Sequence, residues 1–237
     1  MQSPGLLITI SAMPSHLDLN SRSVQDYLKA LYKLQQQDAP VSTNVLAERL
    51  QVAPASATAM MKKLAEAGLV EHIPYQGCRL TDSGRQQALK MVRRHRIIEQ
   101  FLQQVLHYGL DEVDEEAEVL EHAVSDKLIE RMWQVLGQPS HDPHGSPIPD
   151  HQGRFPEQSA RPLCSFSPDQ PLRIVRLKER SPAQLRYLHQ LGIEPGAVVR
   201  LVDKAPFNGP IILHTPNGQH PIARELAEAI LAEPDTP

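Results

Sequence analysis

Carboxylate and imidazole side chains recur at helical spacing in the middle of the sequence. Glu118 and His122 are four positions apart, with Glu121 beside His122. His95 and Glu99 repeat the same spacing earlier in the chain. Residues four apart share one face of a helix, so each pair could hold a metal ion or form an exposed ion pair. The ion-pair interpretation suits His95 alone, because it lies in an arginine-rich run that Glu99 could neutralise.

Two more acids favour the metal interpretation. Asp26 lies on the first predicted helix, and Asp114 lies one turn before Glu118. Three helices could therefore bring acids into one region, where they would repel one another unless a cation balanced them. Oxygen and imidazole ligands suit a divalent first-row metal, which predicts metal binding rather than isolated ion pairs.

Charge is unevenly distributed along the chain. Residues 22–100 hold 12 lysines and arginines against 7 acids, a net of +5, whereas residues 101–137 hold 2 against 9, a net of −7. A basic block followed by an acidic block indicates one anionic and one cationic partner. The alternative is that charges cluster by chance on solvated faces.

Length and composition limit the class of protein. The 237 residues are 41% hydrophobic and 22% charged, with a net charge of −4 and two cysteines. These values are typical of a globular protein with one or two domains, and they exclude a fibre, global disorder and a disulfide framework. The apolar run at residues 6–10 is too short for a signal peptide, so we expect a cytoplasmic protein. Residues 1–21 are predicted to be an extension that is disordered or precedes the true start.

Residues 22–93 predict a winged helix-turn-helix DNA-binding domain. Apolar spacing predicts a helix over 22–36. Ser42 is a predicted N-cap for a second helix that ends at residue 50, and Pro54 is predicted to begin a third helix that ends before Gly68. Residues 69–73 and 78–81 form a predicted hairpin, which a long helix towards residue 107 follows. This order is typical of the winged helix. The alternative is a helical module that does not bind DNA.

The third predicted helix carries the candidate DNA contacts. Small side chains would let it approach the major groove closely, but they include no bidentate base reader, so DNA shape would contribute to recognition. Basic side chains would hold phosphates, unless they are an ordinary solvated face. The candidates are Ala55, Ser56, Thr58, Ala59, Lys62, Lys63 and Arg79.

The rest of the chain predicts two further domains. Residues 94–150 are expected to be a helical metal-binding and dimerisation domain, with a helical region over 111–136. Residues 151–171 are a predicted linker, because the stretch 138–171 is rich in proline. Residues 172–237 predict a small SH3-like β-barrel domain with a hairpin near Asn217 and a closing helix over 223–232. The fold class is therefore mainly α with small β.

Several histidines and both cysteines carry no predicted role. His141, His144 and His151 could bind metal loosely, but they are interpreted as solvated loop residues, and Cys78 and Cys164 as incidental.

Longer motifs resemble those of a known family. The motifs are the winged helix and four runs: Asp26-Tyr27-Leu28-Lys29-Ala30-Leu31-Tyr32, Arg94-His95-Arg96, Glu118-Val119-Leu120-Glu121-His122-Ala123-Val124-Ser125-Asp126 and His144-Gly145-Ser146-Pro147-Ile148-Pro149. Together they resemble the diphtheria toxin repressor family of metal-dependent transcriptional regulators, over residues 22–150. Residues 172–234 resemble the FeoA-type domain of many members. The resemblance implies a homodimer that binds a palindromic DNA operator when it holds metal. It implies a primary metal site of Asp26, Glu118, Glu121 and His122, and an ancillary site of His95, Glu99 and Asp114 with Glu179.

The resemblance also suggests the metal. Iron-responsive members place Met and Cys where this chain has Asp26 and Glu118, so the chain is similar to the manganese-responsive branch, and hard oxygen ligands suit Mn(II). Short manganese regulators have Glu where Lys29 stands, so their two-metal cluster need not be reproduced, and Asp114 replaces a common His. The alternatives are an Fe(II)-responsive regulator, a metal-independent winged-helix regulator, and a carboxylate-bridged metal enzyme. We predict no enzyme, because the repeated Glu-x-x-His of di-iron bundles is absent from the sequence.

Overall fold

The computed structural model describes residues 17–178 and 181–235. The chain divides into two compact units, Met1–Arg85 and Gln86–Pro237. This division lies inside a continuous helix, ahead of the predicted domain boundary at residue 93. Within the described ranges, no helix is long and apolar enough to cross a membrane.

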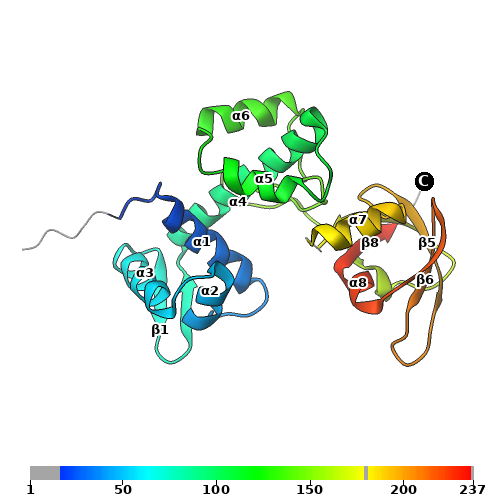
Figure 1. Ribbon diagram of the computed structural model, residues 1–237, viewed down its shortest axis with the longest axis horizontal. Helices are drawn as coiled ribbons and strands as arrows, with labels where there is room; N and C mark the ends of the chain where they lie inside the picture. The colour runs from blue at the N-terminus through cyan, green and yellow to red at the C-terminus, as the bar shows by residue number, and fades with distance from the viewer. Residues whose placement is uncertain (1–16, 179–180, 236–237) are drawn as a thin grey trace, which may run out of the picture. The chain divides into compact units, whose positions relative to one another are not determined.

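The first unit has the predicted winged helix-turn-helix order (Figure 1). Its elements are α1 (Arg22–Gln35), α2 (Thr43–Leu50), α3 (Pro54–Glu66), β1 (Val70–Ile73) and β2 (Gly77–Leu80). Leu28 and Leu31 of α1, Leu46 of α2 and Leu64 of α3 are all buried. The apolar face of each helix therefore contributes to the core of this unit.

Local signals set the ends of these elements. The Ser42 hydroxyl accepts a hydrogen bond from the Val45 amide at 3.3 Å and so caps α2, and Pro54 occupies the first turn of α3. The segment before α2 pairs with the hairpin, because Val41 and Cys78 of β2 exchange two backbone hydrogen bonds of 2.9 Å. Gly77 is required there: its φ is +127°, and a Cβ would lie 2.1 Å from the Val41 carbonyl oxygen.

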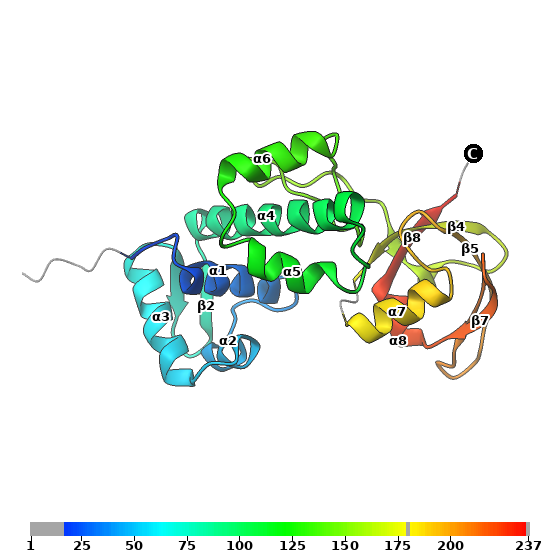
Figure 2. The same cartoon turned by 45° about the horizontal axis from the view of Figure 1, so that its top comes forward.

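The second unit begins with helices that share one core. They are α4 (Asp82–Leu106), whose first turn belongs to the first unit, α5 (Val113–Leu120) and α6 (Asp126–Val135). Figure 2 shows α5 and α6 on either side of α4. Ile98 of α4, Ala117 of α5 and Ile129 of α6 belong to the same buried cluster. The predicted helical region over 111–136 is thus two helices, separated by a turn at residues 121–125.

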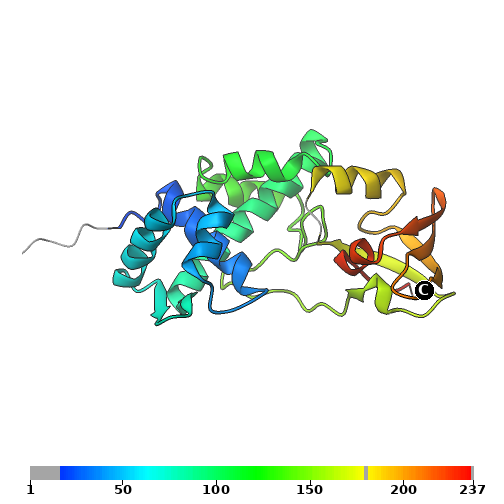
Figure 3. The ribbon, with the colours of Figure 1, turned by 60° about the horizontal axis from the view of Figure 1, so that its bottom comes forward.

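A six-stranded antiparallel sheet forms the rest of the second unit (Figure 3). Its order is β3-β8-β4-β5-β6-β7. Leu185 and Leu188 of α7 and Ala227 of α8 are buried in the core of this sheet. The elements are β3 (Arg161–Pro162), η1 (Leu163–Ser165), β4 (Pro171–Leu177), α7 (Pro182–Gln190), β5 (Val198–Lys204), β6 (Ile211–Thr215), β7 (Gly218–Ile222), α8 (Arg224–Ala229) and β8 (Ile230–Pro234).

Two expectations about this part of the chain differ from the structure. The closing helix predicted over 223–232 ends at Ala229, and β8 follows, because the apolar side chains of Ile230, Leu231 and Ala232 are buried in the sheet. The predicted linker over 151–171 is also shorter, since Arg161 pairs with Ala232 as part of β3. In both places the residues form a strand because they pair with a strand that is distant in the sequence.

Candidate metal centre and DNA-binding helix

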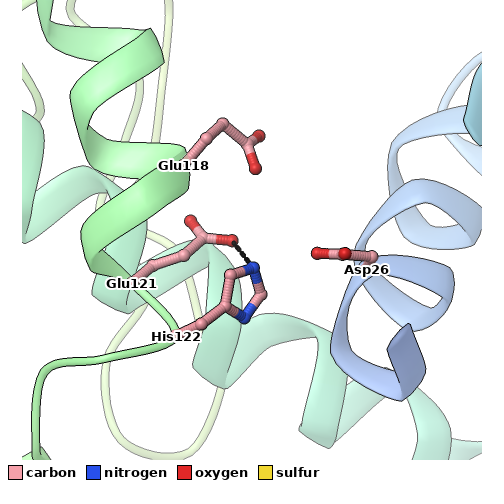
Figure 4. Close-up of side chains that lie close together, drawn as sticks. All are labelled: Asp26, Glu118, Glu121 and His122. Carbon is pink, nitrogen blue, oxygen red and sulfur yellow. Dashed lines mark ion pairs between the residues drawn. The ribbon is translucent and has the colours of Figure 1, made fainter. Parts of the chain in front are cut away.

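Three of the predicted ligands lie together at the end of α5. Figure 4 shows Glu118, Glu121 and His122, with Asp26 drawn on α1 of the first unit. Glu121 is the C-cap of α5, and Val113 and Ala117 are buried in the core. We call Glu118, Glu121 and His122 the turn cluster. The His122 Nε2 lies 3.5 Å from a Glu121 carboxylate oxygen, and Glu121 is fully buried.

His95 of α4 lies among three carboxylates. Its Nδ1 is 2.6 Å from Glu121, and its Nε2 is 3.2 Å from Asp114 and 3.5 Å from Glu99. The sequence placed His95 and Glu121 in separate sites, whereas the structure joins them through this contact.

The surroundings of His95 attract positive charge strongly. Burial by itself would lower the pKa of His95, but the nearby charge of Glu99 and hydrogen bonds to Asp114, Glu121 and Glu99 raise that pKa to about 10. The acids thus stabilise a cationic imidazolium in the interior. A metal cation meets the same electrostatic demand, and the carboxylate and imidazole donors suit a divalent first-row ion. On this observation the side chains fit the metal implied by the sequence.

A second group of possible ligands is fully enclosed. Glu99 of α4, Asp142 and His144 are all buried, and one ligand atom from each lies within 4.8 Å of the others. We call these three residues the buried cluster. The His144 Nδ1 is 3.5 Å from the Glu99 carboxylate. Asp142 was not predicted as a ligand from the sequence, and for His144 loose metal binding was only the alternative to a solvated loop residue.

The prediction that His144 is a solvated loop residue is wrong. Its exposed fraction is 0%, because the loop around it packs against β4. The Leu177 amide donates to the His144 carbonyl at 2.8 Å, and a Cβ on Gly145 would lie 1.8 Å from the Val175 carbonyl oxygen. Asp142 orders the loop by accepting hydrogen bonds from the amides of His144 and Ser146 at 2.9 and 2.8 Å. The signal in the sequence was the motif His144-Gly145-Ser146-Pro147, which supported only the family resemblance.

Asp26 and Glu179 are the other ligands predicted from the sequence. Asp26 is partly exposed on α1, where its carboxylate lies 3.7 Å from Arg22. Glu179 lies outside the described residues. His95, Glu99 and Asp114 also form a group that could hold one ion. The cysteines belong to none of these groups: burial raises the pKa of the Cys78 thiol to about 11, and Cys164 lies in η1.

The candidate DNA contacts on α3 share its solvent-exposed face. Ala55, Ser56, Thr58, Ala59, Lys62 and Lys63 are all exposed, whereas Ala57, Met61 and Leu64 point into the core. Arg79 on β2 is exposed too, but its guanidinium forms a 2.8 Å ion pair with Glu71 on β1. Tyr75, which was not predicted, is fully exposed at the tip of the hairpin. The α3 face is thus small and polar at its start and basic further along.

Comparisons with known proteins place these features in a family. The family model "Iron dependent repressor, N-terminal DNA binding domain" matches residues 20–78. The model "Iron dependent repressor, metal binding and dimerisation domain" matches residues 81–150. A solved structure described as a manganese-dependent transcriptional repressor in complex with manganese is 41% identical, with a TM-score of 0.80, and the match covers 89% of this chain and 99% of that one. The chain belongs to the diphtheria toxin repressor family.

Other relatives agree with this family. The diphtheria toxin repressor of Corynebacterium glutamicum is 26% identical over 217 residues, which are 87% of this chain and 94% of that protein. An uncharacterised helix-turn-helix transcriptional regulator of Methanocaldococcus jannaschii is 41% identical over 115 residues, which are 47% of this chain and 90% of that protein. The FeoA domain model matches residues 161–234, which include the sheet of the second unit. The chain is therefore a metal-dependent transcriptional repressor and not an enzyme.

Proposed function

We propose that this member of the diphtheria toxin repressor family responds to Mn(II), binds a palindromic operator as a homodimer and controls genes for metal uptake. The observation that carries the choice of metal is the donor set of the turn cluster, which offers carboxylate oxygens and imidazole nitrogen and no sulfur. Hard oxygen donors suit Mn(II), whereas thiolate or thioether would favour softer ions. The similarity to a manganese-dependent repressor solved in complex with manganese supports this choice.

An Fe(II) response is the second candidate. Relatives named as iron-dependent repressors, such as that of Mycobacterium tuberculosis, are 27% identical over 219 residues. Because first-row affinities follow a fixed order, the same donors could bind either ion, and metal availability would decide between them.

The primary site in this proposal is the turn cluster completed by Asp26 of α1. When bound, the cation would neutralise these carboxylates. Asp26 lies on α1, which is in the same unit as the proposed DNA-binding helix α3. Metal binding by Asp26 would therefore favour the conformation that binds DNA. By thermodynamic linkage, DNA would raise metal affinity by the same factor by which metal raises DNA affinity.

For the second site we propose the buried cluster. The competing set is the predicted one of His95, Glu99 and Asp114, which shares Glu99 with the buried cluster. Metal stoichiometry separates the two. Under the proposal His144→Ala loses one equivalent of Mn(II) and Asp114→Asn keeps it; the reverse result would assign the site to the predicted set.

For DNA binding we propose that the small side chains of α3 approach the major groove while Lys62, Lys63 and Arg79 contact phosphates. Each lysine removed should lower the slope of log affinity against log salt by about one. Arg79→Ala should lower it less, because Glu71 already pairs with that guanidinium. Equal slopes in all variants and in the wild type would argue against these contacts.

The whole proposal is tested by DNA binding under anaerobic conditions. The probe is a duplex selected by the metal-loaded protein from a random-sequence library, titrated with Mn(II), Fe(II), Co(II) and Zn(II) in turn. We expect Mn(II) to raise affinity and a chelator to remove the effect. DNA binding that is equally tight with chelator and with Mn(II), or a metal response that survives Asp26→Ala combined with His122→Ala, would overturn it.

A further inference from the structure

The turn at residues 121–125 holds two of the three residues of the turn cluster, Glu121 and His122, and it joins α5 to α6. Glu121 ends α5, and Ser125 caps α6 through the Leu128 amide at 3.3 Å. Between them, the amides of Ala123 and Val124 donate to the Leu120 carbonyl at 3.0 Å. The carbonyls at the end of a helix lack partners within the helix, so groups outside α5 must satisfy them.

Arg94 of α4 supplies those partners. Its Nε donates to the Glu121 carbonyl at 3.0 Å, one terminal nitrogen donates to the Val124 carbonyl, and the other pairs with the Asp126 carboxylate. The Arg94 side chain is only 14% exposed. One planar guanidinium thus connects the end of α5, the turn and the first residue of α6.

The charges at both helix ends favour this arrangement. A cation near the C-terminus of α5 and an anion in the first turn of α6 each interact favourably with a helix dipole. Arg94 is also adjacent in sequence to His95, whose Nδ1 lies 2.6 Å from the Glu121 carboxylate. Successive residues of α4 therefore hold the main chain and the side chain of the same ligand.

We infer that Arg94 is a positioning residue: it fixes the turn so that Glu121 and His122 present their ligand atoms together, without itself touching the metal. The inference rests on the metal function proposed above. The three contacts need the fork of donors that arginine has, and lysine, with its single ammonium group, can reproduce only part of them.

The first experiment measures amide hydrogen exchange in the metal-free protein. The variants are Arg94→Gln and Arg94→Lys, with Arg131→Gln as the matched control, because Arg131 lies on α6 and its guanidinium contacts the neighbouring Gln134 side chain at 3.4 Å. We expect exchange of the Ala123 and Val124 amides to be about tenfold faster in Arg94→Gln, with an intermediate value in Arg94→Lys. Exchange in β4–β8 and in the control should not change.

The second experiment measures Mn(II) affinity by titration calorimetry. The affinity compared is that of the binding step that Glu121→Gln abolishes. Loss of an outer partner of a metal ligand typically weakens binding by about 10- to 100-fold, so we expect that range for Arg94→Gln and partial rescue by Arg94→Lys. Wild-type exchange and wild-type affinity in Arg94→Gln would overturn the inference. If the wild type binds no Mn(II) while turn exchange still accelerates, the proposed function fails and the positioning role stands. If Arg94→Gln does not fold, Arg94→Lys decides by the same two measurements.

Discussion

The turn cluster and the buried cluster use the same chemical groups but are assembled differently. The turn cluster comes from one stretch of five residues at the end of α5, and its Glu118 is partly exposed. The buried cluster combines α4 with a loop more than 40 residues later, and all three of its residues are enclosed. A ligand set that solvent can reach can exchange its ion as the metal concentration changes. We therefore propose that the turn cluster carries the metal response and that the buried cluster has a stabilising role.

The strongest test of this division is Glu121→Gln. We expect DNA affinity at saturating Mn(II) to fall by about 1000-fold, or ~4 kcal/mol, since losing a ligand should cost more than the roughly 100-fold for an outer partner. Glu115→Gln, on the exposed side of the same helix, is the matched control. An unchanged metal response in Glu121→Gln would move the sensing function away from the turn cluster.

The buried cluster is tested by His144→Ala. Breaking a buried charged pair typically costs about 3 kcal/mol, so we expect that loss in urea unfolding. The Mn(II)-dependent gain in DNA affinity should persist in the folded variant. His151→Ala serves as control, because its side chain is 60% exposed. Loss of the DNA response with little loss of stability would reverse the assigned roles.

A smaller effect is expected when the loop is changed without touching a ligand. Gly145 has φ +81° and a Cβ there would meet the Val175 carbonyl, whereas Gly137 has φ +76° and open space around it. Gly145→Ala should destabilise the protein by about 2 kcal/mol or more, and Gly137→Ala by about 1 kcal/mol from the backbone conformation alone. Equal losses in thermal or urea unfolding would show that the loop does not depend on its contact with β4.

The smallest effect is expected for Asp114→Asn. Asp114 is 37% exposed and lies 3.2 Å from His95, so its removal should cost less than about 1 kcal/mol of stability. Its effect on DNA binding with Mn(II) should be correspondingly small. A loss of DNA affinity as large as that of Glu121→Gln would instead make Asp114 a principal metal ligand, and the division into two clusters would then be wrong.

The sequence predicted what depends on neighbouring residues. Ser42 and Pro54 located the starts of α2 and α3, and the spacing of Glu118 and His122 located the turn cluster, because caps and helical periodicity are local signals. The family resemblance was likewise confirmed.

The sequence missed what depends on distant partners. His144 looks like a loop residue until its loop packs on β4, and the run from Ile230 continues as a strand only because β3 and β4 flank it. The role inferred for Arg94 depends on carbonyls that lie 27 and 30 positions further along the chain, a separation that no helical period reveals.

The central claim is that the turn cluster and Asp26 bind one metal ion. It is tested most directly by anomalous diffraction at the manganese absorption edge, on crystals of the wild-type protein grown with Mn(II). The account predicts an anomalous peak within coordination distance of the side chains of Glu118, Glu121, His122 and Asp26. Well-ordered side chains at these positions with no anomalous peak between them would contradict it.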